Sequence, residues 1–155
     1  MNRTAGTQTQ AVAGSGPATR TDDPVTRQTR ETFMAYAVDH DPRFYAVDAT
    51  FTDMSNPASP VVGRDAIGAF LGTFYGGVFT DAEGVAENLL IEGERVMLEF
   101  TYRGTHTGRF GELAPTGRRV DLPMMSVYHV EDGLIRWARL YYDSATLWRQ
   151  LGVAG

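Results

Sequence analysis

The apolar residues of this chain change their spacing near Phe79, and the change limits the folds that the chain can adopt. Before Phe79 they recur at the spacing of an amphipathic helix, as Val25, Phe33 and Tyr36 do. After it they alternate with polar residues, most plainly in Arg95–Thr107. Helices followed by long antiparallel strands predict an α+β domain, in which a curved sheet wraps around N-terminal helices.

Turn and cap residues set the limits of the expected elements. Gly76-Gly77 ends a helix that opens near Gly63, and the Asp132-Gly133 pair is a strong hairpin signal. Asp143 or Ser144 is expected to cap the last helix. The expected helical segments are Val25–Asp41, a turn or two within Pro42–Val47, Gly63–Gly77 and Ser144–Leu151, and the expected strands are Ala49–Asp53, Glu83–Ile91, Arg95–Thr107, Arg119–Val130 and Leu134–Asp143.

Composition divides the 155 residues into a tail and one domain. Residues 1–24 are rich in Thr, Gln, Ala, Gly and Ser and contain no aromatic residue, so we expect a disordered N-terminal tail. Residues 25–155 are enough for one domain with a core of its own.

Charge and residue content exclude several classes of function. The net charge of −5 is unlike that of a nucleic-acid-binding protein. No run of apolar residues approaches the length of a membrane span, and Met1–Gly16 lacks the apolar core of a signal peptide. We therefore expect a cytoplasmic protein. The chain has no cysteine, and His40, His106 and His129 stand far apart in sequence. We therefore predict no metal site, since the fold would have to assemble one.

Asp53 is the candidate for chemistry, because it ends a short strand and precedes a turn-rich loop. Phe51 precedes it, and the following helix carries Ile67, Phe70 and Phe74 at helical spacing. A carboxylate shielded by hydrocarbon binds a proton more readily and can act as a base near neutral pH. The alternative is a solvated turn residue or a helix cap.

Several short segments of the chain, in their order and spacing, resemble the SnoaL-like polyketide cyclases. This family belongs to the superfamily that includes ketosteroid isomerase, limonene epoxide hydrolase and nuclear transport factor 2. The resemblance covers about Val25 to Gly152. Its motifs are Gly63–Ile67, Gly104–Gly108 with Pro115–Arg119, and Glu131–Ile135 followed by Asp143 and Gln150–Gly152.

The resemblance implies a cone-shaped barrel of strongly bent antiparallel sheet, closed by helices around an apolar pocket. It also implies cofactor-independent chemistry and, in many members, a homodimer formed through the sheet. Asp53 falls where ketosteroid isomerase has its general base. That enzyme is a standard example of catalysis by a carboxylate. Ser126 falls where the isomerase has a protonated aspartate, and Phe33 lies near the position of its tyrosine. The loss of those donors weakens the isomerase interpretation.

The sequence also departs from its relatives at the second acid or base. Leu140 stands where SnoaL-type enzymes carry an aspartate. Arg103 matches the arginine of the epoxide hydrolases, but Thr105 and Leu140 replace their two aspartates. Arg103 is either a surface residue or an oxyanion partner inside the pocket.

We therefore expect a cyclase of secondary metabolism that closes a ring in a hydrophobic, polyketide-like substrate. Asp53 and Arg103 are the expected catalytic residues. Strand parity places Ser126 and Tyr128 on one face and His129 on the other. Alternatives are a pocket that acts by shape alone, an isomerase or epoxide-opening enzyme, and a non-catalytic module that binds a small ligand. The expected substrate-binding residues are Phe33, Phe51, Phe74, Tyr102, Ser126, Tyr128, Leu140 and Tyr142.

Overall fold

The computed structural model describes residues 23–153. The expected disordered tail therefore lies outside the described residues, except for its last two positions. Asp23 caps the first helix by accepting a hydrogen bond from the backbone N–H of Thr26, and Pro24 is the first helical residue. The helix thus begins one residue before the predicted domain boundary, because proline fits the first helical position.

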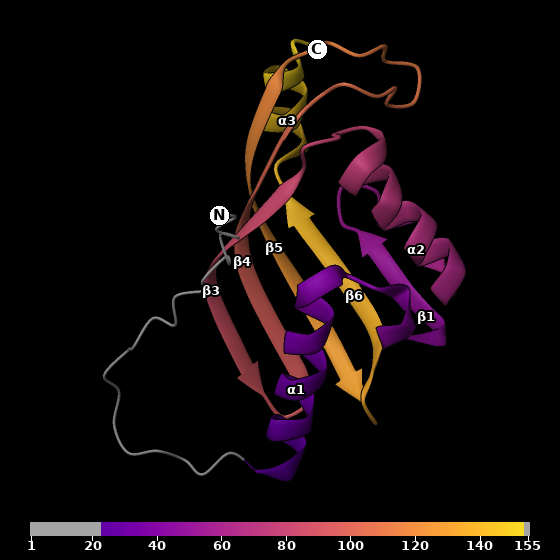
Figure 1. Cartoon of the computed structure of the whole chain (residues 1–155), viewed down its shortest axis with the longest axis vertical. Coiled ribbons are helices and arrows are strands. Elements are labelled where there is room, and N and C mark those ends of the chain that lie inside the picture. Colours follow the sequence, from indigo (N-terminus) through magenta and orange to yellow (C-terminus); the bar gives the residue numbers. More distant parts are fainter. Residues whose placement is uncertain (1–22, 154–155) are drawn as a thin grey trace, which may run out of the picture.

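Three α-helices and six strands follow in the described part of the chain (Figure 1). The predicted change from helices to long strands is confirmed. The helices are α1 (Pro24–Asp39), α2 (Arg64–Gly72) and α3 (Ser144–Leu151), with short helical turns η1 (Pro42–Phe44) and η2 (Thr73–Gly77). The strands are β1 (Tyr45–Asp53), β2 (Val61–Val62), β3 (Glu83–Glu92), β4 (Arg95–Thr105), β5 (Arg119–Glu131) and β6 (Leu134–Tyr142).

The strands form one sheet in the order β2-β1-β6-β5-β4-β3. The α+β class is as expected, but the predicted antiparallel barrel needs two corrections. The sheet does not close on itself, since β2 and β3 are its edges. It is also mixed, because β1 pairs with β6 in parallel while the other neighbours are antiparallel.

Strand β1 is longer than predicted. The chain was expected to make helical turns through Pro42–Val47, but only Pro42–Phe44 is helical and the strand begins at Tyr45. Tyr45 lies beside Ile135 of β6, and both side chains are buried. Sheet pairing and burial therefore decide the conformation of a segment that local sequence leaves ambiguous.

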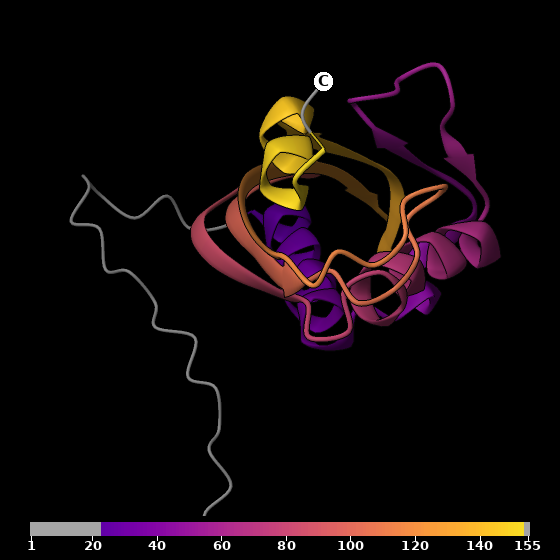
Figure 2. The same ribbon diagram turned by 90° about the horizontal axis from the view of Figure 1, so that it is seen from above.

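The sheet bends, and α1 and α2 lie against its concave side (Figure 2). One core cluster joins α1, β1, α2 and the middle of the sheet. A second cluster joins α3 to β4, β5 and the segment after η2. No helix within residues 23–153 combines the length and the apolarity that a membrane crossing needs.

Two turns predicted from local sequence take the expected form. Asp132 and Gly133 both have positive φ angles, 51° and 73°, as a tight hairpin between β5 and β6 requires. Asp143 accepts a hydrogen bond of 3.0 Å from the backbone N–H of Ala145 and so caps α3. The hairpin fixes where β6 begins, and the cap fixes where it ends. The end of β6 at Tyr142 forms part of the site described next.

Candidate active site

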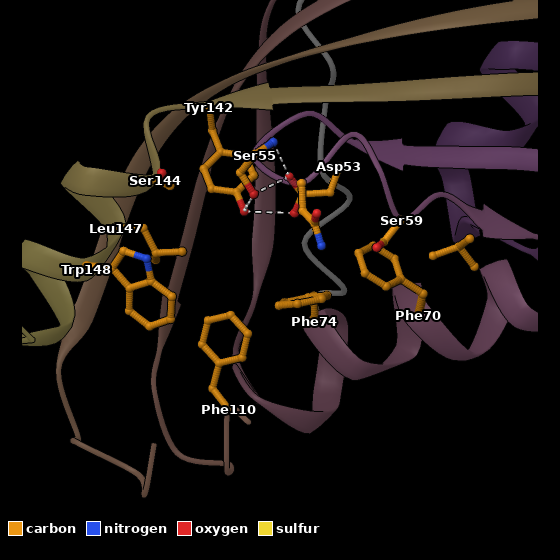
Figure 3. Close-up of a pocket in the computed structure, with 12 residues that line it drawn as sticks. Asp53, Ser55, Ser59, Phe70, Phe74, Phe110, Tyr142, Ser144, Leu147 and Trp148 are labelled. Carbon is orange, nitrogen blue, oxygen red and sulfur yellow. Dashed lines mark hydrogen bonds between the residues drawn. The ribbon is translucent and has the colours of Figure 1, made fainter. Parts of the chain in front are cut away.

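The carboxylate of Asp53 lies at the end of β1 and accepts three hydrogen bonds (Figure 3). Oδ1 accepts from the backbone N–H of Ser55 at 2.8 Å and from the Ser55 hydroxyl at 2.7 Å. Oδ2 accepts from the Tyr142 hydroxyl at 2.8 Å. These bonds fix the orientation of the carboxylate at the end of the strand.

The parallel pairing of β1 with β6 explains why Asp53 and Tyr142 meet. Asp53 lies opposite Leu140, and Tyr142 is two residues further along β6 on the same face. The backbone N–H of Met54 also donates to the carbonyl of Leu140 at 2.8 Å, which fixes the start of the loop. The bond from Ser55 is a local turn of the Asx type, so Asp53 both shapes its loop and presents a carboxylate oxygen to Tyr142.

Tyr142 is held as a neutral donor. Burial raises the pKa of its hydroxyl to about 12, against a smaller lowering effect from the hydrogen bond with Ser55. The Ser55 and Tyr142 hydroxyl oxygens are 3.1 Å apart. Asp53, Ser55 and Tyr142 therefore form a connected triangle that can accept a proton at one corner and donate one at another.

A cavity of about 570 Å³, here called the inner chamber, lies between the concave face of the sheet and helices α1 and α2. Its size is in the range of small-molecule sites. Asp53 and Tyr142 are at its boundary. The residues that line it include Phe33, Tyr36, Phe51, Phe70, Phe74, Tyr75, Leu98, Phe100, Tyr102, Met124, Ser126, Tyr128 and Leu140.

Hydroxyl groups gather where α1 faces the sheet. The hydroxyls of Tyr36 and Tyr45 are hydrogen-bonded at 3.0 Å, and burial raises the pKa of both residues. Burial also raises the pKa of Tyr128, and the nearby hydroxyls of Ser126 and Tyr36 offset part of this rise. Among the described residues, the buried Ser126 Oγ has no hydrogen-bond partner within normal geometry. This end of the chamber therefore offers neutral hydroxyls to a bound polar atom.

A second, smaller cavity of about 270 Å³, here called the outer hollow, lies on the other side of Asp53. The Phe110 and Trp148 rings stack in its wall, with centroids 5.4 Å apart. Figure 3 shows these rings below Asp53 and Tyr142, with Phe74 between Phe110 and Phe70. Five residues line both cavities: Asp53, Phe70, Phe74, Tyr142 and Leu147. Asp53 therefore lies at the junction of two hydrophobic spaces.

Most of the residues predicted from the sequence meet at this site. Asp53 and all eight expected substrate-binding residues line the inner chamber: Phe33, Phe51, Phe74, Tyr102, Ser126, Tyr128, Leu140 and Tyr142. The positions of Ser126 and Tyr128 agree with the strand alternation that placed them on one face. Their roles in catalysis or binding stay predictions.

Arg103 is the exception. It lies on the outer face of β4, where its Nε donates to the Asp121 carboxylate at 3.0 Å. The prediction that Arg103 joins Asp53 in catalysis therefore has no geometric support. The alternation of β4 places Arg103 and Tyr102 on opposite faces of the strand. This alternation predicted the position of Arg103 better than the match to the arginine of the epoxide hydrolases did.

His106 is buried behind the site rather than in it. Its Nδ1 accepts from the backbone N–H of Thr116 at 3.2 Å, and the ring packs 5.7 Å from that of Phe79. Two residues further on, Gly108 has no room for a side chain, because a Cβ there would lie 1.8 Å from the carbonyl oxygen of Gly77. These contacts hold the loop that carries Phe110 against η2.

Sequence reasoning missed Phe110 and undervalued Trp148. Phe110 lies in a glycine-rich loop without periodicity, so no pattern indicated where its ring would point. Trp148 is on α3, and it was not among the substrate-binding residues expected from the sequence. It is 38% exposed, which leaves its ring available to the outer hollow.

An open, bent sheet with helices over an aromatic chamber is the architecture of the nuclear transport factor 2 and ketosteroid isomerase class. The chain belongs to the SnoaL-like polyketide cyclase family, whose model matches residues 25–151. A search of curated proteins finds no match to this sequence.

Solved structures support the same fold. A proposed SnoaL-like polyketide cyclase from Jannaschia sp. CCS1 is 20% identical, with a TM-score of 0.78 over 88% of this chain and 100% of that one. IdmH, a proposed polyketide cyclase from Streptomyces antibioticus, is 25% identical, with a TM-score of 0.62 over 81% and 99% of the two chains. AclR, a proposed hydroxylase from Streptomyces galilaeus, is 19% identical, with a TM-score of 0.67 over 82% of each chain. The different assignments of these neighbours show that the fold alone does not determine the reaction.

Proposed function

We propose that this protein is a cofactor-independent cyclase that closes a ring in a hydrophobic, polyketide-type substrate held in the inner chamber. The observation that carries the proposal is the position of Asp53. Its carboxylate lies at the junction of the two cavities, and the neutral Tyr142 hydroxyl donates to it at 2.8 Å. Membership of the SnoaL-like family supports ring closure as the class of reaction.

In the proposed reaction, Asp53 removes a proton from a carbon that lies between two carbonyl groups of the substrate. The electron pair of that C–H bond forms an enolate, whose carbon attacks a further carbonyl group of the same molecule. A carbon–carbon bond forms, the attacked C=O becomes an alkoxide, and the proton held by Asp53 returns to that oxygen. Positioned acid–base groups of this kind contribute about 10²- to 10⁴-fold in rate.

The hydroxyl end of the chamber suits the carbonyl oxygen that gains charge. Ser126 Oγ is buried with no hydrogen-bond partner among the described residues, and burial keeps Tyr128 neutral by raising its pKa. Donors that are already in place stabilise a developing negative charge without first reorganising. In this arrangement Asp53 handles the proton and Ser126 and Tyr128 bind an oxygen.

A second candidate is a non-catalytic module that binds a small apolar ligand. The observation that favours it is the turn in which Ser55 donates twice to Asp53, since that bonding also serves the loop structure alone. An intermediate case is a cyclase that acts by shape, where the chamber only holds a reactive conformer and proximity supplies the rate. The epoxide-hydrolase alternative loses support because Arg103 lies outside the chamber.

The test is the variant Asp53→Asn, assayed with a panel of synthetic linear poly-β-ketones by chromatography of the cyclised products. Asp48→Asn is the matched control, because Asp48 is an exposed residue of the same strand. We expect kcat/KM to fall about 10²- to 10⁴-fold in Asp53→Asn and to stay unchanged in Asp48→Asn.

Two other results would overturn the acid–base proposal. A near-normal rate in Asp53→Asn would leave a chamber that acts by shape. Tight binding without turnover, detected by quenching of Trp148 fluorescence, would favour the binding module.

A further inference from the structure

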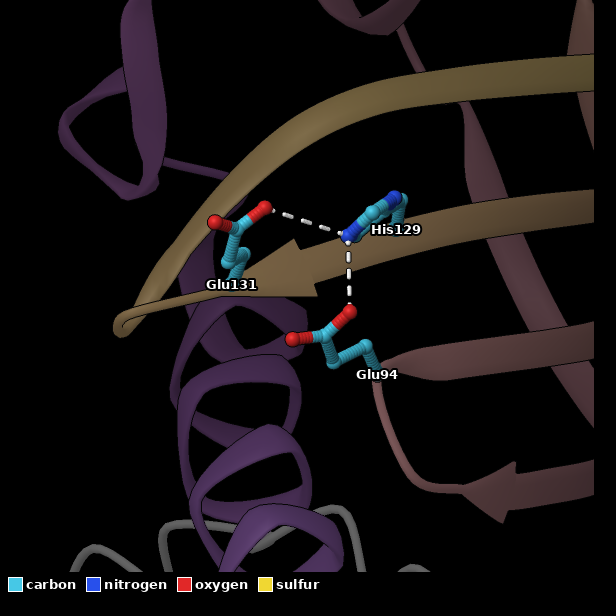
Figure 4. A group of neighbouring side chains, drawn as sticks. All are labelled: Glu94, His129 and Glu131. Atoms are coloured by element: carbon cyan, nitrogen blue, oxygen red, sulfur yellow. Dashed lines mark ion pairs between the residues drawn. The ribbon is translucent and has the colours of Figure 1, made fainter.

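Three side chains able to bind a metal meet on the convex face of the sheet, away from the chamber (Figure 4). Nε2 of His129 is 3.1 Å from a carboxylate oxygen of Glu94 and 3.5 Å from one of Glu131. All three donor atoms lie within 4.8 Å of one another. Ligands about 2.0–2.2 Å from one Zn²⁺ ion are separated by roughly 3.3 Å in a tetrahedral site, so these spacings are close to those of a metal centre.

The backbone holds the three residues in place. His129 and Glu131 alternate along β5 and therefore share its convex face. Glu94 belongs to the turn between β3 and β4, and its carbonyl accepts from the backbone N–H of Val130 at 2.8 Å. The hydroxyl of Thr26 in α1 accepts from the next turn residue, Gly93, at 2.8 Å. The donor set is thus positioned by the fold before any ion binds, as metal sites require.

The imidazole of His129 is not explained by its two carboxylate neighbours. In the described part of the chain its Nε2 is shielded from water, yet neither glutamate oxygen lies in the direction of a hydrogen bond. The carboxylates flank the ring nitrogen instead of facing it. A metal ion on the nitrogen lone pair, with one oxygen on each side, would satisfy this arrangement, whereas a protonated imidazole would point toward one of the oxygens.

Two arginines near the cluster pack on Trp137. Arg95 follows Glu94 in the chain, but its guanidinium lies 5.1 Å from the ring centroid of Trp137, and Arg139 lies 4.6 Å from the same centroid. The Glu94 and Glu131 side chains are 43% and 47% exposed. An ion could therefore enter from solvent and keep water in its open positions.

We propose that Glu94, His129 and Glu131 bind a divalent transition-metal ion of the zinc class. One imidazole and two carboxylates suit Zn²⁺, Co²⁺ and Ni²⁺ better than Mg²⁺, which prefers oxygen ligands alone. The ion would link the β3–β4 turn to the end of β5. Since Asp53 is on the other face of the sheet, this site is independent of the proposed cyclisation.

The test uses Trp137, whose ring centroid is 5.7 Å from that of His129. The full chain has two tryptophans, so Trp148→Phe makes Trp137 the only one. Co²⁺ is titrated into this metal-free protein while Trp137 fluorescence is followed. We expect saturable quenching with one ion per chain, at least about 10-fold weaker binding in Glu131→Gln, and loss of saturable quenching in His129→Asn.

His40→Gln is the matched control, since His40 is a histidine of the chamber wall and should leave the titration unchanged. A second readout is the melting temperature with and without Zn²⁺, which should rise in the parent protein and stay constant in His129→Asn. Equal melting temperatures of the two proteins in EDTA would show that the substitution preserves the fold. Quenching that does not saturate, or that is the same in His129→Asn, would overturn the proposal.

Discussion

The two faces of strand β5 have opposite chemistry. On the concave face, Ser126 and Tyr128 are buried and line the inner chamber. On the convex face, His129 and Glu131 belong to a polar cluster whose glutamate side chains are partly exposed. Successive side chains of a strand point to opposite faces of the sheet. One strand can therefore contribute to an apolar chamber on one face and to a polar cluster on the other, without either perturbing the other.

In the part of the chain that the structure describes, Asp53 and Tyr142 are the ionisable residues that line both cavities. Asp53 and Tyr142 come from the ends of β1 and β6 rather than from the middle of a strand. At a strand end the carboxylate can face the chamber and still reach the backbone N–H of Ser55 in the loop. A carboxylate on the buried middle of β5 would lack such a partner and would be costly to ionise.

Among substitutions that compare the two faces of a strand, the largest expected effect is that of filling the chamber from β5. Ser126→Leu places a larger apolar side chain in the cavity and removes its hydroxyl, so we expect kcat/KM for the cyclisation to fall at least about 100-fold. Val127→Leu, on the opposite face of the same strand, should leave the rate within about twofold. Steady-state kinetics of the two variants measures the difference. Equal losses in both would contradict the assignment of the two faces.

Tyr142 and its neighbour Tyr141 give the next comparison, because they are adjacent residues of β6 on opposite faces. Tyr142→Phe removes the hydrogen bond to Asp53, and we expect a rate about 10-fold lower, whereas Tyr141→Phe should have no effect. Since the pKa of Tyr142 is about 12, the parent enzyme should show no loss of this donor up to about pH 10. A rate that is unchanged in Tyr142→Phe would remove Tyr142 from the mechanism.

The convex face also carries apolar side chains that no part of residues 23–153 covers, which gives the expected homodimer a location. These are Leu90, Met97, Met125 and Tyr141, each between 38% and 61% exposed. We predict that a second copy of the chain packs on them, and that Met125→Glu weakens the dimer at least about 10-fold by placing charge in an apolar contact. Val38→Glu, on an exposed position of α1, is the control. Sedimentation equilibrium that finds a monomer in the parent protein would contradict this prediction.

The sequence predicted the elements better than it predicted their neighbours. Period and turn residues located the hairpin at Asp132-Gly133 and the cap at Asp143, because both are set by local backbone chemistry. The parallel pairing of β1 with β6 joins residues far apart in the chain, so no local signal showed that Tyr142 would bond Asp53. For the same reason, separated histidines suggested no metal site, although the fold brings His129 to Glu94.

The smallest expected effect concerns His40, a histidine at the edge of the chamber. Burial lowers the pKa of His40, partly offset by Asp39, and its ring stacks on that of Tyr75 with centroids 5.4 Å apart. The unfolded chain, where a histidine has a pKa of about 6.5, then binds more protons than the folded one. Stability should therefore fall as the pH drops below about 6.5, and His40→Gln should remove that part of the dependence.

Four aspartates with lowered pKa values titrate outside this window. The pKa values of four aspartates are lowered below 3.8 by hydrogen bonds from nearby backbone or hydroxyl groups, so the stability they provide is lost only under more acidic conditions. Because His40 is partly exposed, we expect the melting temperature to fall by only about 1–2 °C more in the parent protein than in His40→Gln between pH 7.5 and pH 5.5. Differential scanning calorimetry at the two pH values measures this. A dependence as steep in His40→Gln as in the parent would contradict the prediction, because it would mean that the proton is taken up elsewhere.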